Sequence, residues 1–334
     1  MRPIFLVGVL ASLGLLSVGV FLYVRRPLLS ESPRRAPAGA DAARLRRHVE
    51  ILAAMTPRDS DHPRILDRAA RYVSAELRDS GARMSEQAYA FDWFDQRNRK
   101  QRLGPFRNII ASFGPDTAER VVVGAHYDAF GPFPGADDNA SGVAVLLEAG
   151  RLLGREPLAL RVDLVAFTLE EPPFFATPHM GSARHAVKLK EEGVRVRAML
   201  SLEMLGRYSD APGSQATPSV LLKLLYPSAG DFVAVVTDHA SRGLAKPVKA
   251  AMSGFGLPVY SITAPASVPG IDYSDHSSYW DQGYPAVMVT DTAFYRNKDY
   301  HTPKDTPERL DYARMALAAE GVVSAVRGLA KAAP

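Results

Sequence analysis

A histidine and several carboxylates crowd one short stretch of this sequence, directly after an apolar run at residues 121–123. His126 and Asp128 follow that run, and a glycine-rich loop then leads to Asp137 and Asp138. A neutral imidazole beside ionised carboxylates is the ligand chemistry that divalent zinc prefers in catalytic sites. Burying so many unpaired charges in a packed core is costly, which leaves a metal site or a solvated, turn-rich loop.

Further candidates follow later apolar runs of the chain, namely Glu170, Glu171, Glu203 and His301. If these runs are parallel strands, their carboxyl ends meet at one edge of a sheet, where ligands gather in open α/β folds. Each residue also has an ordinary structural reading. A histidine at a strand end is often a hydrogen-bonded structural residue, and two aspartates before a helix form a natural N-cap. Their joint occurrence at successive strand ends favours a hydrolytic metal site.

Alternating apolar patterns predict the elements that position these residues. Helical spacing predicts helices at 42–55, 65–80, 141–153, 183–192, 233–243 and 307–331. Short apolar runs bounded by turn residues predict strands at 108–111, 120–125, 162–168, 197–202, 258–262 and 285–290. Strands that alternate with helices indicate an α/β domain with a mostly parallel central sheet, flanked by helices on both faces.

The composition is that of a globular protein and excludes several kinds of site. The chain of 334 residues carries a formal charge of +4, and much of the excess lies in arginines near its start. It has no basic stripe with interleaved aromatic residues, so we expect no nucleic-acid partner. The absence of cysteine excludes disulfides, thiolate zinc sites and cysteine nucleophiles.

The start of the chain reads as a separate unit. An uncharged run from Pro3 to Val24 has the length of a membrane-spanning helix, and no convincing cleavage site follows it. Arginines after this run favour a cytoplasmic domain. The resemblance of the run to an uncleaved export signal favours a periplasmic or extracellular domain, which is the localisation we expect. The predicted units are a single-pass transmembrane anchor at 1–27, a linker at 28–43 and a catalytic domain at 44–334.

The order of the motifs resembles the co-catalytic dizinc exopeptidases. That family includes bacterial leucyl aminopeptidases, aminopeptidase Y, glutamate carboxypeptidases and, as a divergent branch, glutaminyl cyclases. The resemblance covers the chain from about Asp41 onward and rests on segments 124–128, 134–142, 170–171, 202–206, 274–276 and 301–306. It implies a zinc-peptidase α/β fold, peptide substrates and two zinc ions, although the ligand types also suit cobalt or manganese.

The resemblance also implies a role for each metal-ligand candidate. Asp138 would bridge the two ions. Glu171 and His301 would complete one site, and His126 and Glu203 would complete the other.

Two more carboxylates complete the implied mechanism. Asp128 would accept a hydrogen bond from His126 and fix its tautomer. Glu170 would be the general base, which takes a proton from the attacking water and passes it to the leaving amine. Such assistance contributes about 10²–10⁴-fold to a rate. Divalent metals assist the same reaction by lowering the pKa of water and polarising the carbonyl.

The chain departs from the family pattern after the two adjacent glutamates. The segment 172–180 is longer than in most relatives, and its Phe174 and Phe175 are expected to shape a wall of the substrate pocket. Other candidates for that pocket, for which a structural role is equally compatible, are Tyr273, Asp275 and His276.

Three functions follow from the sequence. The first is a membrane-anchored zinc exopeptidase acting as an aminopeptidase, with carboxypeptidase or dipeptidase activity left open. The second is a glutaminyl cyclase-like acyltransferase, whose branch keeps one zinc through the positions of Asp138, Glu171 and His301. The third is a non-catalytic membrane receptor of the same fold. Retention of His126 and Glu203 favours the peptidase with two metals.

Overall fold

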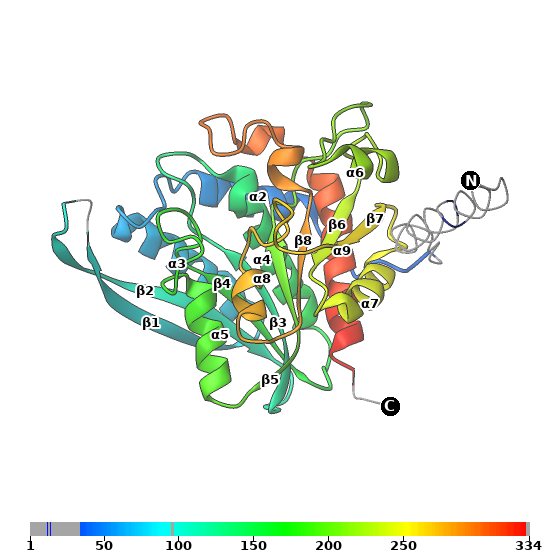
Figure 1. Cartoon of the computed structure of the whole chain (residues 1–334). Coiled ribbons are helices and arrows are strands. Elements are labelled where there is room, and N and C mark those ends of the chain that lie inside the picture. The colour runs from blue at the N-terminus through cyan, green and yellow to red at the C-terminus, as the bar shows by residue number, and fades with distance from the viewer. Residues whose placement is uncertain (1–11, 13, 15–33, 95–96, 332–334) are drawn as a thin grey trace.

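The computed structural model describes residues 12, 14, 34–94 and 97–331, which build a mixed α/β fold around one sheet (Figure 1). The predicted anchor at 1–27 lies almost entirely outside these residues, as does the start of the predicted linker at 28–43. Within the described ranges, no helix is both long and apolar enough to cross a membrane.

The sheet has eight strands and a parallel centre. They are β1 (Arg83–Phe94), β2 (Lys100–Phe113), β3 (Glu119–His126), β4 (Arg161–Phe167), β5 (Arg195–Glu203), β6 (Val233–Thr237), β7 (Val259–Thr263) and β8 (Ala286–Thr290). Their spatial order is β1-β2-β4-β3-β5-β8-β6-β7. The strands β4, β3, β5 and β8 are parallel, whereas the pairings β1–β2, β2–β4 and β8–β6 are antiparallel. The expected mostly parallel sheet is therefore a mixed one.

Helices cover both faces of this sheet (Figure 1). They are α2 (Ala42–Ala53), α3 (Pro63–Asp79), α4 (Gly142–Leu153), α5 (Gly181–Glu191), α6 (Val220–Leu225), α7 (Arg242–Met252), α8 (His276–Trp280) and α9 (Tyr312–Leu329). One buried apolar cluster joins α2, α3, α4, α7 and α9 to one face. A second joins α5 and α8 to the other face, which confirms the expected flanking of the sheet on both sides.

Strand β3 shows why the centre of the sheet reads as a continuous apolar run. Val121, Val123 and Ala125 pack into the first cluster, whereas Val122 packs into the second. A parallel strand covered on both faces buries every side chain, which favours apolar and β-branched residues at each position. The run ends at His126, the last residue of the strand.

One part of the predicted secondary structure is wrong, and another is too short. Residues 233–243 are not a helix, because Val233–Thr237 form β6 and helix α7 begins only at Arg242. Periodicity cannot separate a short buried strand from a buried helical turn. The predicted strand at 108–111 is only the end of β2, which is 14 residues long. Strands β1 and β2 form a long antiparallel hairpin that projects from the edge of the sheet (Figure 1).

The end of the predicted linker is bound to the domain. The carboxylate of Glu320 on α9 accepts the backbone N–H groups of Ala38, Gly39 and Ala40 at 2.5, 2.7 and 2.6 Å. Asp41 then caps the N-terminus of α2. Because charge-assisted hydrogen bonds of this kind are strong, they fix the path by which the chain enters the domain. The fixed part of the chain therefore begins before the boundary predicted at residue 44.

Candidate metal centre

The carboxyl ends of the central strands meet at one edge of the sheet. Strand β3 ends at His126 and β5 ends at Glu203, while Glu170 and Glu171 follow β4 after a short turn. His301 lies on the loop after β8. These strands are parallel neighbours, so the five side chains are brought to the same edge.

Asp138 lies between the two histidines. Its Oδ1 is 3.5 Å from Nε2 of His126, and its Oδ2 is 3.1 Å from Nε2 of His301. A carboxylate whose two oxygens face two different ligand sets has the geometry to bridge a pair of cations. The bridging role predicted for Asp138 is compatible with this placement.

The glutamates divide between the two histidines. Oε2 of Glu203 is 3.4 Å from Nε2 of His126, and Oε2 of Glu171 is 3.2 Å from Nε2 of His301. Glu170 lies on the His126 side, with its Oε2 3.7 Å from Nε2. Candidate ligand atoms fall within 4.8 Å of one another in two groups, namely His126, Asp138 and Glu171, and His126, Glu170 and Glu203. Glu170 therefore lies close enough to His126 to serve either as base or as ligand.

Several polar atoms of this cluster are buried without a hydrogen-bond partner. They include both ring nitrogens of His126, Nε2 of His301 and Oε1 of Glu171. Buried polar atoms are nearly always paired, because leaving one unpaired costs about 1–3 kcal/mol. Divalent cations held between the histidines and the carboxylates would satisfy these atoms together, so the residues fit the zinc ions that the family resemblance implies.

The crowding of buried acids also shifts their protonation. Burial raises the pKa of Glu170 well above its usual range and raises the pKa of Glu171 to about 8. Burial alone would raise the pKa of Asp138 as well, but the rings of His126 and His301, at 3.5 and 3.1 Å, hold that pKa below its usual range. Asp138 therefore keeps its negative charge more readily than its neighbours, as a bridging ligand requires.

Asp128 orients the two glutamates through their backbone. Its Oδ1 accepts the N–H of Glu170 at 3.2 Å, and its Oδ2 accepts the N–H of Glu171 at 3.0 Å. The same Oδ1 is 3.6 Å from Nδ1 of His126, which is longer than a hydrogen bond. The predicted hydrogen bond to His126 is thus not formed at this distance. Asp128 acts on the turn that carries Glu170 and Glu171.

Hydrogen bonds separate the roles of Asp137 and Asp138. The carboxylate of Asp305 accepts the backbone N–H of both residues at 3.1 Å. Asp137 directs its own carboxylate to the backbone N–H of Gly206 at 2.9 Å and to the side-chain amide of Asn297 at 3.0 Å. Asp138 therefore faces the histidines, while Asp137 anchors the loop.

Comparison with known proteins assigns this site to a family. The sequence model of Peptidase family M28 matches residues 108–326, which contain every member of the cluster. The chain belongs to peptidase family M28. This confirms the family predicted from the sequence motifs.

Two curated proteins illustrate the range of M28 relatives. The uncharacterized protein YfbL of Escherichia coli strain K12 is 43% identical over 298 residues, which cover 86% of this chain and 88% of that protein. Leucine aminopeptidase 1 of Ajellomyces capsulatus strain G186AR is 30% identical over 239 residues, which cover 67% of this chain. The matched part is 56% of that aminopeptidase, so this chain spans about half of its length.

Solved structures share the fold of this M28 chain. The LapA aminopeptidase of Legionella pneumophila has a TM-score of 0.66 at 18% identity, with 87% of this chain and 72% of that chain covered. A glutaminyl cyclase of Bacteroides thetaiotaomicron has a TM-score of 0.65 at 19% identity, with 89% of this chain and 99% of that chain covered. The likeness shows the fold, and a fold alone does not fix the reaction.

An arginine outside the region matched to M28 supports the cluster, and no sequence pattern pointed to it. Arg58 lies between α2 and α3 and is 1% exposed. Its guanidinium donates hydrogen bonds to the backbone carbonyls of Leu52, Tyr127, Pro134 and Gly135. One side chain thus ties the residue after His126 to the loop that leads to Asp138. A lone arginine in a turn carries no motif, so only the folded structure reveals it.

Gly135 is required at the point where this arginine meets the loop. Its φ is +54°, in the left-handed region that favours glycine. A Cβ there would lie 2.2 Å from the carbonyl oxygen of Asp138 and 2.9 Å from Nη2 of Arg58. The loop can therefore reach the cluster only because a glycine leaves room for the guanidinium.

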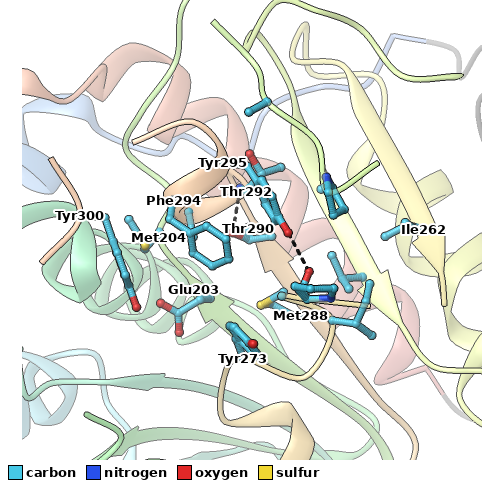
Figure 2. Close-up of a pocket in the computed structure, with 18 of the residues that line it drawn as sticks. Glu203, Met204, Ile262, Tyr273, Met288, Thr290, Thr292, Phe294, Tyr295 and Tyr300 are labelled. Atoms are coloured by element: carbon cyan, nitrogen blue, oxygen red, sulfur yellow. Dashed lines mark hydrogen bonds between the residues drawn. The ribbon is translucent and has the colours of Figure 1, made fainter. Parts of the chain in front are cut away.

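A cavity of about 430 Å³ opens beside the metal cluster (Figure 2). The acids of the cluster and His301 line one part of it, and most of the remaining lining is apolar or aromatic. In Figure 2, Glu203 and Tyr300 lie at one end of the cavity, and Ile262 lies at the other end. A concave apolar site with a few polar groups at one end is the usual form of a substrate pocket.

Two of the five residues predicted to contact substrate line this cavity, Phe175 and Tyr273. Their rings meet nearly edge to face, with centroids 6.1 Å apart. Tyr273 is 47% exposed, so it lies where the cavity opens to solvent.

The other three residues are not among those that line this cavity. Phe174 is buried against the rings of Phe91 and Trp93, so it joins the β1 strand to the segment 172–180. Asp275 and His276 are also buried and do not line the cavity. The His276 ring is hydrogen-bonded to a backbone carbonyl at 2.7 Å, which gives it the structural role left open by the sequence.

The variant Arg58→Lys tests how much the hydrogen bonds from Arg58 to backbone carbonyls contribute to the metal cluster. A single ammonium cannot reach four carbonyls, so we expect zinc affinity and kcat/KM to fall by about 10–100-fold, as for other residues that orient metal ligands. Zinc loss to a chelator would be measured well below the melting temperature. The control Arg197→Lys removes carbonyl contacts to Leu329 and Lys331 near the start of β5, at the end of that strand opposite to Glu203. Equal zinc retention in the two variants would contradict the role of Arg58.

Proposed function

We propose that this M28 protein is a zinc-dependent aminopeptidase that removes residues from the N-termini of peptides. The observation that carries the proposal is the distribution of charge around the cavity. Glu170, Glu171 and Glu203 line the end beside the cluster. Among the described residues that line the cavity, none is lysine or arginine.

This charge pattern favours an amine over a carboxylate as the free end of the substrate. A peptide C-terminus would enter the cavity without a fixed cation to pair with, which is costly in a desolvated site. An N-terminal ammonium would instead lie near ionised carboxylates. These carboxylates lie at the metal end of the cavity, where the N-terminal residue of a peptide would place its ammonium.

The residues of the chain would divide the work of hydrolysis as follows. His126, His301, Asp138, Glu171 and Glu203 would hold two zinc ions, which when bound lower the pKa of water and polarise the scissile carbonyl. Glu170 would take a proton from the attacking water and deliver it to the leaving amine. Asp128 would hold the backbone turn of Glu170, through the hydrogen bond at 3.2 Å, so that the base stays beside His126.

A glutaminyl cyclase-like acyltransferase is the second candidate, and the shared fold supports it. The observation against it is the retention of His126 and Glu203, whose side chains approach to 3.4 Å on the far side of Asp138. These two residues would give the chain a second metal position. A non-catalytic receptor is disfavoured because all five metal-ligand candidates and the proposed base are present in one cluster, which is buried except for the partly exposed His301.

The variant Glu170→Gln separates the proposed base from the proposed ligands. We expect about two zinc ions per chain in both wild type and variant, and a fall in kcat of at least about 10²-fold in the variant. Zinc would be counted by elemental analysis of freshly purified protein. Loss of zinc from the variant would make Glu170 a ligand rather than the base, and one zinc per wild-type chain would favour the cyclase.

Blocking the amine of the substrate tests whether the protein acts at the N-terminus of a peptide. We expect hydrolysis of peptides with a free N-terminus, little hydrolysis of the same peptides after N-acetylation, and no effect of amidating their C-terminus. The reason is that acetylation removes the charge that the carboxylates would bind. Activity should disappear with a chelator and return with zinc. Preference for a free C-terminus would overturn the aminopeptidase assignment.

Membrane anchoring by residues 1–27 is proposed from the sequence, whose uncharged run there has the length of a spanning helix. We expect the full chain to sediment with membranes and to require detergent for release, whereas a chain beginning at Arg34 should remain in the supernatant. Protease access in sealed cells would report the side on which the catalytic domain lies. A full chain that stays in the supernatant would contradict the anchor.

A further inference from the structure

The floor of the cavity is one face of the antiparallel extension of the sheet. Phe232, Ala234 and Val236 follow the two-residue period of β6, and Met288 and Ile262 continue the same face on β8 and β7. Val233 and Val235 point to the opposite face, into the main core. Figure 2 shows Met288 and Ile262 on the strands beneath the open space.

Ala234 is the smallest side chain of this floor. Its strand partners are Thr290 on β8 and Tyr260 on β7. Larger residues, Phe232 and Val236, precede and follow it on the same face of β6. The floor is therefore lowest at Ala234, and a larger side chain there would project into the cavity.

Three loops form the walls, and hydrogen bonds join them to one another. Nε2 of Gln215 donates to Oγ1 of Thr292 at 2.8 Å, and Nε of Arg296 donates to Oε1 of Gln215 at 3.0 Å. The hydroxyl of Tyr295 donates to the carbonyl of Pro269 at 3.0 Å. Because each wall is bound to its neighbour, the cavity is formed before substrate arrives.

Aromatic rings surround the space above the floor. Tyr273 contacts Phe175 on one side and Phe294 on the other, with ring centroids 6.1 and 6.2 Å apart. Phe294 in turn contacts Tyr300, with centroids 5.8 Å apart. Figure 2 shows Phe294 and Tyr273 on opposite sides of the space, between Tyr300 and Ile262. Aromatic pairs favour edge-to-face or offset contacts, so these rings suit another ring between them.

The volume of the cavity also favours a large occupant. A volume of about 430 Å³ falls within the range of about 300–1,000 Å³ that is usual for ligand pockets. A small side chain would leave much of the apolar wall in contact with water or empty, which forfeits packing energy.

On these grounds we infer that the cavity selects an aromatic N-terminal side chain, and that Ala234 sets the depth to which the ring enters. The inference rests on the proposed aminopeptidase function. Acidic side chains are disfavoured because no lysine or arginine among the described lining residues could pair with them. Basic side chains are disfavoured because every carboxylate among those lining residues belongs to the metal cluster, so the apolar part of the cavity offers them no partner.

A panel of aminoacyl amides of one leaving group tests the selectivity on the wild-type protein. We expect kcat/KM for Phe, Tyr and Trp to exceed that for Leu, and to exceed that for Ala by at least about tenfold, with Glu and Lys lowest. Equal rates for Leu and the aromatic residues would overturn the selectivity while leaving the aminopeptidase assignment intact. Absence of hydrolysis across the whole panel would instead count against the proposed function.

The variants Ala234→Val and Ala234→Leu test the role of the floor. We expect the ratio of Trp to Ala hydrolysis to fall in a graded manner, by about tenfold or more in the leucine variant. The matched control is Ala264→Leu, at a position in the same apolar cluster that does not line the cavity. Zinc content and melting temperature would be measured for each variant. An unchanged ratio in folded, zinc-loaded Ala234→Val protein, or an equal change in the control, would overturn the assignment to Ala234.

Discussion

Four acids and two histidines share one buried edge of the sheet, and the rest of the structure depends on keeping them together. Carboxylates repel one another, and their removal from water is expensive unless cations or hydrogen bonds compensate. The raised pKa values of Glu170 and Glu171 express that cost. Among these four acids, only Asp138, which lies between His126 and His301, has a lowered pKa. A site of this composition would gain its full stability with cations bound, and metal binding would then be coupled to folding.

Hydrogen bonds to the backbone hold the loops that carry these acids in place. Asp305 holds the amides of the loop that presents Asp138, and Asp128 holds the amides of the turn that presents Glu170 and Glu171. Arg58 performs the complementary task, because it binds carbonyls where the carboxylates bind amides. Acids on one side of the loops and a guanidinium on the other therefore fix the irregular backbone between the strands. Such support determines the orientation of ligands as strongly as the strands themselves do.

The sequence predicted the cluster but not its support, for a physical reason. Parallel strands share their carboxyl ends, so residues such as His126 and Glu203 could be placed together from the order of apolar runs alone. Arg58 acts through carbonyls, which every residue possesses, so its partners leave no trace in the sequence. Strand β6 was predicted as a helix because a short buried run fits both periods. Phe174 was expected in the pocket because a sequence does not show which of two adjacent rings turns toward the core.

The mixed sheet separates the proposed metal site from the proposed substrate cavity. The parallel strands β4, β3 and β5 supply the metal cluster, whereas the antiparallel pairing of β6 with β8 adds a second surface beside it. Loops and the short helix α6, whose Leu222 lines the cavity, lie over that surface and leave the cavity between them. A substitution on β6 such as one at Ala234 can therefore change the volume of the cavity without moving a metal ligand. The same catalytic edge could in this way serve M28 proteins with different pockets, since the residues that hold metal and those that hold the side chain lie on different strands.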